Sequence, residues 1–568
     1  MVRKSVVIAI TLMIIAIVVV GSISYIYLSK YRPSKIVKHI TKPTKVKITP
    51  TCSISWPNVT VQYAKLFKII NTGKYYIIIK DASNHTFILV PNGCPIPKNV
   101  SGIVLKVPLS RVVYFSTTEV ALLYRIAEAL HNMTLLRSII GVTWRGVWWI
   151  PHIQDMVNNG TIKYVGSSWN PNIEKIVSLN PQLVVMYTGI PTMVQVMYKL
   201  EKSGLKVFVD NEWLEHTYLA RFEWIKAIAA LYGPKALKAS EEIFEKTVKT
   251  VEEIYNKCRN TRPVKYAWMV MYWGKFYIPG TESYVVKALS KMNGVYIFAT
   301  SRLARVGSVT ASREFIDSKI PNAQVIVISG FPPYTTSINI YIKTLPDMST
   351  SPAVKMFRIF MLHPSYWQLG YAYTGQVLLQ LASILHPYKF RGIYRTFFIP
   401  IYYNNINTTF GKVKIIWRGY YEIVKDYYND SIMIIPWGLI NQTKYYNPKV
   451  FTAIGRLEKD LKIVNAIVQT PVHRIAISRT CLKYVEDLGF SKSVIYIVNK
   501  SLNIENIVKL RPQVVVLDYR NSNISIVRKL LKFKIPVIVL DCSSKYSGFI
   551  ISLLYNYPDL GYMLYMSK

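Results

Sequence analysis

Cysteine and acidic residues are scarce in this sequence, and each shortage excludes a class of protein. The 568 residues include five cysteines, none of them in a Cys-x-x-Cys pair. A disulfide-rich scaffold and a zinc site built on such pairs are therefore excluded. Only 30 Asp and Glu stand against 70 Lys and Arg, a formal net charge of +40. Because the basic residues are scattered and no nucleic-acid-binding motif occurs, we expect no nucleic-acid partner.

Motifs of catalysis and nucleotide binding are missing too. The eight histidines are dispersed, with no His-Glu-x-x-His motif, and no P-loop or Rossmann glycine fingerprint is present. We therefore predict that the chain is not an enzyme and has no cofactor or metal site of its own. With 51% hydrophobic residues the chain is too apolar to be disordered, and its length predicts two to four folded units.

A long uncharged run stands near the start. Residues 5–28 carry no charge and follow Arg3 and Lys4. At about 1.5 Å per helical residue, such a run can span a hydrocarbon core of about 30 Å. We predict a transmembrane anchor or signal segment over 1–28, with the uncleaved anchor favoured because the run exceeds a usual signal core. The prediction is a single-pass cell-membrane protein with most of the chain extracytoplasmic, although the lysines that follow the run argue weakly for the opposite orientation.

The next segment and the sequons agree with export. Residues 29–50, rich in Lys, Pro and Thr, are interpreted as a stalk. Ten Asn-x-Ser/Thr sequons predict a glycoprotein; they begin at Asn58, Asn84, Asn99, Asn132, Asn159, Asn407, Asn429, Asn441, Asn499 and Asn523. Outside the cell Cys52 and Cys94, or Cys481 and Cys542, could form disulfides that leave Cys258 over, but the sequence does not decide the pairing.

The remainder of the chain contains an internal repeat. Residues 170–186 (NPNIEKIVSLNPQLVVM) and 501–517 (SLNIENIVKLRPQVVVL) are identical at ten of seventeen positions. The segments on either side align in the same order, which indicates a duplicated unit. Each copy is preceded by two short alternating strands, around 61–80 and 415–435, which predict a β-hairpin.

Short Val/Ile-rich runs alternate with helical segments in both copies. The strands are expected at 111–115, 138–142, 182–187 and 205–209, and again at 474–477, 493–498, 513–517 and 536–540. Continuous apolar strands between helices predict a parallel sheet covered on both faces. Ligands of such sheets bind at the carboxyl ends of the strands.

Only the first copy continues into a second α/β series. A helical stretch over 217–258 is interrupted near Gly233-Pro234, and further strands follow at 264–272, 296–298 and 323–329. The predicted fold class is α/β, with two Rossmann-like lobes joined by a long spine helix, an incomplete further α/β lobe and an N-terminal transmembrane helix. The predicted units after the stalk are a β-hairpin extension (51–107), an amino-terminal lobe (108–216), a spine helix (217–260), a carboxy-terminal lobe (261–405), a second β-hairpin extension (412–470) and a second, incomplete amino-terminal-type lobe (471–568).

Five stretches within this order match one known family. They are 111–119 (RVVYFSTTE), 172–181 (NIEKIVSLNP), 277–284 (YIPGTESY), 312–314 (SRE) and 384–387 (ILHP). The chain resembles the helix-spined, class III substrate-binding proteins of ABC importers for ferric siderophores, haem and cobalamin. The resemblance covers about 57–405 in full and about 412–568 in part. The chain lacks the cysteine of a lipidation signal after the hydrophobic run, so the helix itself is the expected anchor.

The resemblance implies two sets of functional residues. Glu174 and Glu314 match the exposed glutamates that dock onto arginines of the permease, and Glu505 holds the same position in the second copy. The ligand would lie between the lobes, where aromatic and Arg side chains suit a flat or anionic metal chelate. The candidate ligand contacts are Trp144, Arg145, Trp148, Trp149, Tyr187, Trp213, Trp273, Arg302 and Arg305. For Trp148 and Trp149, packing in the protein core is the alternative.

The predicted function is that of an extracytoplasmic solute-binding component of an ABC importer. It would capture an iron chelate, haem or a corrinoid and deliver it to the permease, its partner. A cell-surface adhesive protein built on the same lobes is the alternative, and a chelatase-like enzyme is the third possibility. An expected consequence of the incomplete lobe is an apolar stretch at 549–555 that must be covered by the complete unit or by a second molecule.

Overall fold

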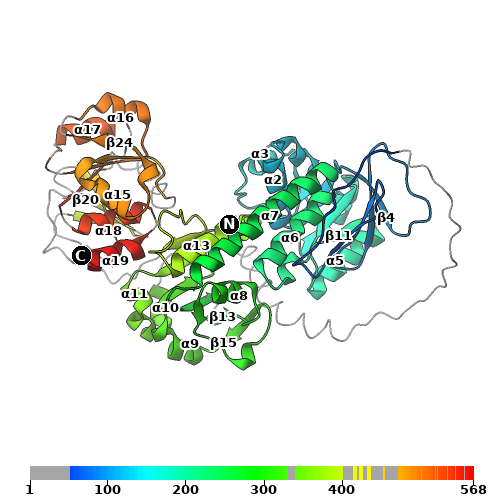
Figure 1. Ribbon diagram of the computed structural model, residues 1–568, viewed down its shortest axis with the longest axis horizontal. Coiled ribbons are helices and arrows are strands. Elements are labelled where there is room, and N and C mark those ends of the chain that lie inside the picture. The colour runs from blue at the N-terminus through cyan, green and yellow to red at the C-terminus, as the bar shows by residue number, and fades with distance from the viewer. Residues whose placement is uncertain are drawn as a thin grey trace.

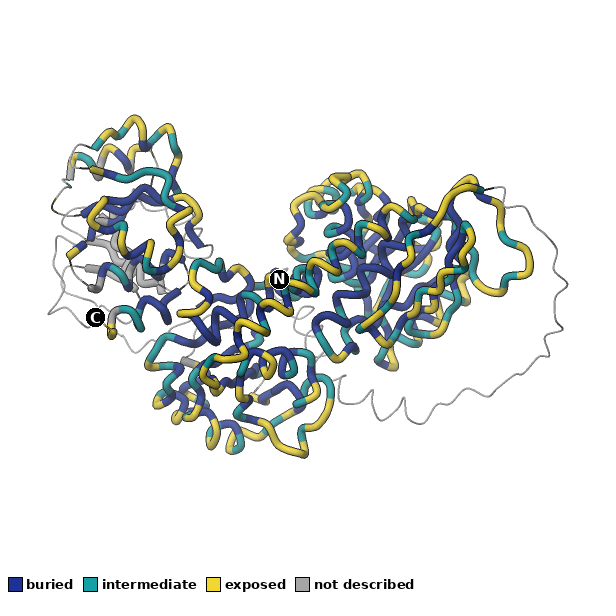
Figure 2. The backbone as a smooth tube through the Cα atoms, in the orientation of Figure 1, coloured by how far each residue is buried: buried dark blue, intermediate teal, exposed yellow. Residues whose placement is uncertain are grey.

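The computed structural model of the chain describes residues 52–272, 274–330, 339–400 and, with gaps, 413–567. The predicted membrane segment and stalk lie outside these residues. The described part forms three α/β lobes in sequence order, the last standing beside the carboxy-terminal lobe (Figure 1). Central strands of the lobes are buried, whereas exposed residues lie mostly on the outer helices and loops of the described part (Figure 2).

A small sheet precedes the first lobe. The predicted hairpin is confirmed as two antiparallel strands, but two further strands that pair with each other in parallel were not foreseen. In order across the sheet, the four strands are β1 (Lys68–Asn71), β2 (Ile77–Lys80), β3 (Thr86–Pro91) and β4 (Ile103–Val107). The disulfide between Cys52 and Cys94 joins the start of this extension to the loop between β3 and β4.

The amino-terminal lobe has the predicted parallel sheet. Its strands lie in the order β11 (Val207–Val209), β10 (Leu183–Met186), β5 (Val112–Tyr114), β6 (Ile139–Val142) and β7 (Lys163–Tyr164). The strands β5, β10 and β11 are buried along their whole length, because helices cover both faces of the sheet. The helices of the lobe are α2 (Thr117–Ala129), α3 (Pro151–Asn158), α4 (Ile173–Ser178) and α5 (Pro191–Lys202).

The spine consists of two helices rather than one. The first, α6 (Tyr218–Ala230), ends before Gly233, and α7 (Pro234–Cys258) begins directly after it. Gly233 has a φ of 94°, which few other residues adopt, and Pro234 suits the first helical position. The helix break predicted near this pair is therefore confirmed. From there α7 runs between the two lobes (Figure 1).

The carboxy-terminal lobe is built on a mixed seven-stranded sheet. Its strands are β12 (Val264–Tyr272), β13 (Lys275–Pro279), β14 (Gly294–Tyr296), β15 (Ser308–Ala311), β16 (Val325–Ile328), β17 (Ile359–Leu362) and β18 (Phe398–Pro400). Its helices are α8 (Tyr284–Lys291), α9 (Arg313–Lys319), α10 (Asn339–Thr344), α11 (Pro352–Lys355), α12 (Tyr366–Leu369) and α13 (Thr374–Leu385). Parallel pairing of β12, β14, β16 and β17 makes its core a second α/β unit.

The last lobe, residues 471–568, repeats the first, and we call it the repeat lobe. Its sheet has the order β22 (Thr452–Ala453), β26 (Val537–Leu540), β25 (Val514–Asp518), β23 (Ile475–Ser478) and β24 (Val494–Val498). Ahead of it lies the antiparallel sheet β19 (Val413–Arg418), β20 (Tyr421–Asp426) and β21 (Ser431–Pro436). The helices of the repeat lobe are α15 (Leu482–Asp487), α16 (Ile504–Leu510), α17 (Ile524–Lys532), α18 (Lys545–Leu554) and α19 (Pro558–Ser567).

The duplication extends to individual hydrogen bonds. In the first copy, the side-chain oxygen of Gln182 accepts from the backbone of Ser110 and Arg111 at 2.7 and 3.0 Å. In the second, Gln513 accepts from His473 and Arg474 at the same distances. The guanidinium groups of Arg111 and Arg474 each donate to the carbonyl of the corresponding helix end. The predicted repeat is therefore a repeat of structure.

A disulfide and an extra helix complete the repeat lobe. Cys481 and Cys542 are bonded, which leaves Cys258 as a free, buried thiol. The chain does not stop at the predicted spine-like helix, because α19 folds back along α18. Phe549 and Tyr555 are 4% and 0% exposed, so the apolar stretch that needed a cover is covered.

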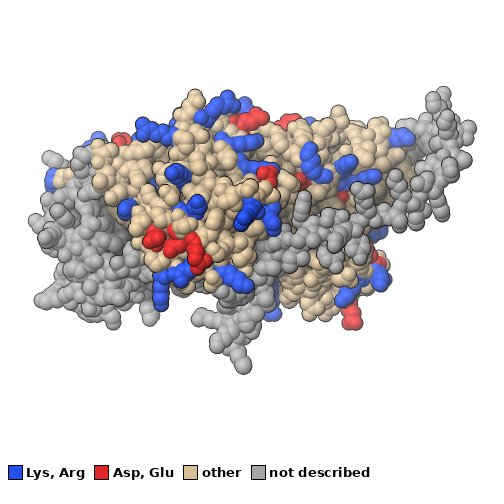
Figure 3. Space-filling view, turned by 90° about the horizontal axis from the view of Figure 1, so that it is seen from below, with Lys and Arg blue, Asp and Glu red and all other residues tan. Residues whose placement is uncertain are grey.

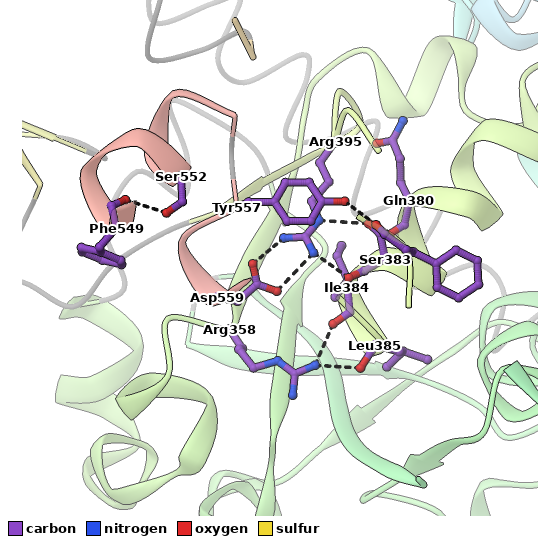
Figure 4. A network of polar contacts seen from close by, with 11 residues as sticks. Arg358, Gln380, Ser383, Ile384, Leu385, Arg395, Phe549, Ser552, Tyr557 and Asp559 are labelled. Atoms are coloured by element: carbon purple, nitrogen blue, oxygen red, sulfur yellow. Dashed lines mark hydrogen bonds and ion pairs between the residues drawn. The ribbon is translucent and has the colours of Figure 1, made fainter. Parts of the chain in front are cut away.

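A buried ion pair joins the repeat lobe to the carboxy-terminal lobe. Arg395 donates two hydrogen bonds to the carboxylate of Asp559, at 2.7 and 3.1 Å, and both side chains are 0% exposed (Figure 4). The guanidinium also donates to the carbonyl of Ser383 at 2.6 Å and lies 3.8 Å from the ring centre of Tyr557. The expected packing of the incomplete lobe against the complete unit is thus confirmed. Among the residues described, no helix is long and apolar enough to cross a membrane.

Replacement of Asp559 by Ala should destabilise this interface strongly. Removal of one partner of a buried ion pair costs about 3–5 kcal/mol, because the remaining charge is left without compensation. We expect a lower melting temperature in calorimetry. The double variant Arg395→Met, Asp559→Leu is the matched control and should recover most of the loss, since apolar groups replace a buried pair at little cost. An Asp559→Ala variant that melts with the wild type would contradict the role of the pair.

Candidate ligand-binding site

Acidic side chains gather where the strands of the amino-terminal lobe end. Glu119 lies in the first turn of α2, after β5, and Asp210 follows β11 directly. Glu212 begins the short 3₁₀ helix that comes next. These three residues are 1%, 1% and 5% exposed. With Arg221 of α6 and Tyr371, between α12 and α13, we call them the interlobe seam.

Burial governs the protonation of two of these acids. Burial raises the pKa of both Glu119 and Asp210 well above the ordinary range. The negative charges of neighbouring acidic side chains raise both pKa values further. One oxygen of Glu119 accepts from the backbone of Ser116 at 3.1 Å, which closes the capping box of α2. The other oxygen, like Oδ2 of Asp210, has no hydrogen-bond partner in the part of the chain that the structure describes. Both acids are therefore poised to hold a proton inside the seam.

Arg221 provides the positive charge of the seam. Its guanidinium forms an ion pair with Glu212 at 2.8 Å. It also lies 4.3 Å from the ring centre of Tyr284 in α8 and 5.3 Å from that of Tyr371. Since Tyr284 and Tyr371 belong to the carboxy-terminal lobe, a single cation of the spine contacts residues of both lobes.

The loop after β6 is tied to the opposite lobe. The backbone of Trp149 donates to Gln368 of α12 at 3.0 Å, and the Gln368 amide donates to the carbonyl of Val147 at 2.7 Å. The ring of Trp149 meets that of His363 edge-on, 4.6 Å between centres. Burial lowers the pKa of His363 to about 4, so this contact is made by a neutral imidazole. The loop thus reaches the carboxyl end of β17.

The predicted tryptophans of this loop differ in exposure. Trp149 is 38% exposed and Trp144 is half-buried, whereas Trp148 is only 4% exposed and packs in the core of the lobe. Trp148 thus packs as its alternative interpretation had it, and its contact with a ligand stays a prediction. Arg145 is exposed, with its guanidinium 5.8 Å from the ring centre of Tyr164. It is available to a ligand without breaking an ion pair.

The remaining predicted contacts are dispersed. Tyr187, directly after β10, shares a hydrogen bond with Ser168 at 3.1 Å, and burial raises its pKa to about 12. Trp213 packs against the turn at Gly189, where a Cβ atom would lie 2.6 Å from its ring. Arg302 and Arg305 are exposed in a loop between β14 and β15. Among the described residues no hydrogen bond, ion pair or ring contact joins these two arginines to the first lobe. Trp273 lies outside the described residues.

The predicted docking glutamates both lie in the first turn of a helix whose N-terminus is capped by a side chain. Glu174 follows the cap of α4, where Asn172 accepts from the backbone of Lys175 at 2.8 Å. Glu314 follows the cap of α9, where Ser312 accepts from Phe315 at 3.1 Å. Both glutamates are exposed, and a carboxylate in the first turn is favoured by the helix dipole. Glu505 of α16 repeats this arrangement. The structure places them on the surface, which leaves their proposed role open to test.

Comparison with known proteins identifies the family. Residues 135–366 match the family model of the periplasmic binding proteins. An uncharacterized lipoprotein of Methanocaldococcus jannaschii is 32% identical over 397 residues, which cover 66% of this chain and 92% of that protein. The chain belongs to the periplasmic binding protein family. The predicted resemblance to its helix-spined members is confirmed, and because the family consists of solute-binding proteins, the prediction that the chain is not an enzyme agrees with it.

Two further likenesses complete the comparison. A second lipoprotein of the same organism is 27% identical over 338 residues, covering 58% of this binding protein and 84% of the relative. The solved structure of an iron uptake substrate-binding protein from Streptococcus pneumoniae matches 52% of the chain and 97% of its own, with 17% identity and a TM-score of 0.38. That likeness is too weak to bear on the ligand.

The relatives correct the predicted localisation. Both Methanocaldococcus proteins are named lipoproteins, which implies attachment by a lipid rather than by a membrane-spanning helix. The prediction of a single-pass membrane protein is therefore wrong on this comparison. The hydrophobic run 5–28 on which it was based lies outside the described residues. No finding supports the predicted glycosylation.

The interlobe seam was missed by sequence reasoning. In the sequence, Glu119 is the last residue of a Ser-Thr-Thr-Glu capping box. This local role accounts for the residue, so the sequence alone does not indicate that it lies between the lobes. Asp210 could have been found, because it directly follows a predicted strand at the edge where such sheets bind ligands. Tyr371 and Gln368 come from a lobe far along the sequence, and no local pattern marks them.

Substitution of Glu119 by Gln should stabilise the protein as the pH rises. An acid with a raised pKa in the folded state favours folding below its unfolded pKa of about 4.3, and that contribution is lost as pH rises through the folded value. Gln keeps the capping box but needs no proton. We expect the variant's melting temperature to exceed that of the wild type by at least ~2 °C at pH 8, and the gap to close near pH 4.

The exposed Glu174 offers the matched control. A Glu174→Gln variant should not gain stability over the wild type at pH 8, because its carboxylate is exposed and lies in the first turn of α4, where the helix dipole favours a negative charge. A Glu119→Gln variant whose difference from the wild type is the same at both pH values would refute the buried-acid interpretation.

Proposed function

We propose that this binding protein captures a metal chelate between its two lobes outside the cytoplasm and delivers it to an ABC permease. The candidate ligands are a ferric siderophore, haem or a corrinoid. The observation that carries the proposal is the loop after β6, which holds Trp149 against the opposite lobe and carries the half-buried Trp144 and the exposed Arg145 a few residues earlier. Membership of a solute-binding family supports it and does not favour the adhesive or chelatase alternatives.

Each part of the loop has a distinct task in this proposal. The exposed ring of Trp149 and the half-buried ring of Trp144 offer flat apolar faces to a macrocycle or an aromatic chelator. Arg145 supplies charge-assisted hydrogen bonds to the acid groups that such ligands carry. Gln368 fixes the loop backbone through two hydrogen bonds, at 3.0 and 2.7 Å, and so sets its distance from the carboxy-terminal lobe.

The seam below the loop supports this arrangement. Protonated Glu119 and Asp210 would leave Glu212 and Arg221 as a neutral pair, so the region between the lobes adds little net negative charge. An anionic chelate would then meet Arg145 without repulsion from buried carboxylates. Tyr187 and Trp213 are further proposed contacts from neighbouring strand ends, and Arg302, Arg305 and Trp273 are proposed contacts from the carboxy-terminal lobe.

Replacement of Arg145 by Ala should weaken binding of an anionic chelate. The loss is expected to be about 1–3 kcal/mol, since a charge-assisted hydrogen bond is removed from an exposed side chain. Titration with haemin, followed through quenching of tryptophan fluorescence, measures it. An Arg137→Ala variant, which removes an exposed arginine of the same lobe, should bind as the wild type does. Unchanged haemin affinity in the Arg145→Ala protein, where the wild type binds, would remove Arg145 from the site.

Charge reversal at the proposed docking glutamates should separate uptake from binding. In the double variant Glu174→Arg, Glu314→Arg, repulsion from permease arginines should reduce chelate uptake by cells at least ~10-fold while ligand affinity stays unchanged. Glu242→Arg on the exposed face of α7 is the control for a change of net charge. Glu505→Arg shows whether the repeat lobe docks as well. Normal uptake by the double variant would dismiss the docking role.

A further inference from the structure

The carboxyl edge of the repeat-lobe sheet is open to solvent. The strands of this sheet lie in the order β26-β25-β23-β24. The chain passes from β23 to its neighbour β24 on one side, and then crosses over to β25, the neighbour of β23 on the other side. The ends of β23 and β25 therefore flank a topological switch point, which is where open α/β sheets bind ligands. Arg479 and Thr480 follow β23, Asn499 follows β24 and Arg520 follows β25, and all four residues are exposed.

Hydrogen bonds organise this edge from strand to strand. The guanidinium of Arg479 donates to the side-chain oxygen of Asn499 at 3.0 Å. Thr480 donates to Asp518 at 2.7 Å, across the switch point, and the other Asp518 oxygen accepts from the backbone of Arg520 at 3.1 Å. The Arg520 guanidinium in turn donates to Ser543 at 2.6 Å. We call Arg479, Thr480, Asn499, Arg520 and Ser543 the repeat-lobe edge.

A covalent link holds the two sides of the edge together. Cys481 directly follows Thr480, Cys542 directly precedes Ser543, and the two cysteines are bonded. Asp518 beneath them is 1% exposed and accepts hydrogen bonds at both oxygens. The side chains above it are therefore held in place before any ligand arrives, which lowers the entropy that binding must overcome.

The same edge has the opposite character in the first copy. There the strand ends carry the acids Glu119 and Asp210, which are 1% exposed because the carboxy-terminal lobe covers them. In the repeat lobe, Leu482 stands where Glu119 does and Arg479 replaces Ser116, whereas an acid, Asp541, keeps the position of Asp210. Duplication has thus replaced one of the two acids and placed two exposed arginines, Arg479 and Arg520, at this edge. The two edges suit different ligands.

We propose that the repeat-lobe edge is a second binding site, one for small oxyanions that carry two or more carboxylate or phosphate groups. The forked guanidinium groups of Arg479 and Arg520 would each engage one acid group. The side-chain amide of Asn499, whose oxygen accepts from Arg479, adds a neutral N–H donor. The site is separate from the interlobe region and does not depend on the proposed import of a chelate.

Calorimetric titration of the full-length chain in detergent with citrate and with inorganic phosphate tests this site. We expect saturable binding of citrate tighter than about 1 mM. The double variant Arg479→Gln, Arg520→Gln should weaken it at least ~10-fold, because two charge-assisted contacts are lost. The variant Arg479→Lys, Arg520→Lys keeps the charge but loses the fork, and its affinity should fall between the two.

Controls separate the site from general attraction to a basic protein. Arg262→Gln removes an exposed arginine between α7 and β12 and should leave citrate binding unchanged. The ligand-free melting temperature of each variant verifies that it is folded. Equal citrate affinity in the wild type and the folded Gln double variant would overturn the proposal, as would an equal loss in the Arg262→Gln variant. Loss of citrate binding in Arg145→Ala alone would assign citrate to the interlobe region and overturn it too.

Discussion

One helix supplies core residues to both halves of the binding protein, and this shared helix constrains everything else. The first part of α7 contributes Leu237 and Phe244 to the core of the amino-terminal lobe, and its last part contributes Val251 and Ile254 to that of the other lobe. The lobes therefore cannot separate without exposing apolar surface, at about 25 cal/mol per Å². Ligand capture must rely on the loops between them, of which the loop after β6 makes the most direct contact.

Buried charge fixes the extension of the chain to the same spine. Lys226 of α6 is 0% exposed and donates to the carbonyl of Thr60 at 2.8 Å and to Glu223 at 3.0 Å. Glu223 also accepts from three consecutive backbone amides, the first of them Gln62 at 2.8 Å. Buried ions persist only when paired in this way. The segment from Thr60 to Ala64 is thus attached to the helices that join the lobes, and Arg395 with Asp559 attaches the repeat lobe by the same means.

Surface charge follows a different rule. Lys and Arg are spread over the face seen in Figure 3 and do not form one patch. The exposed arginines that matter for recognition are therefore distinguished by position in the fold rather than by charge density. Arg145 in the loop after β6 and Arg479 at the end of β23 are both exposed, as many other arginines are. Only their places at strand ends mark them as candidates for binding.

Local patterns in the sequence determined the elements and their order. The strands of the two repeated copies, the helix break at Gly233 and the duplication could be predicted, because each depends on residues close in sequence or on a repeated pattern. The pairing of the cysteines was left open by the sequence and is decided by the fold. The parts of the chain that cover each sheet edge could not be predicted in this way. Glu119 is buried in a seam to which Tyr371, some 250 residues later, also belongs, whereas at the same edge of the repeat lobe the described residues Arg479, Asn499 and Arg520 are exposed. Burial, and with it protonation and access to ligand, depends on neighbours in space, and only the tertiary structure decides which these are.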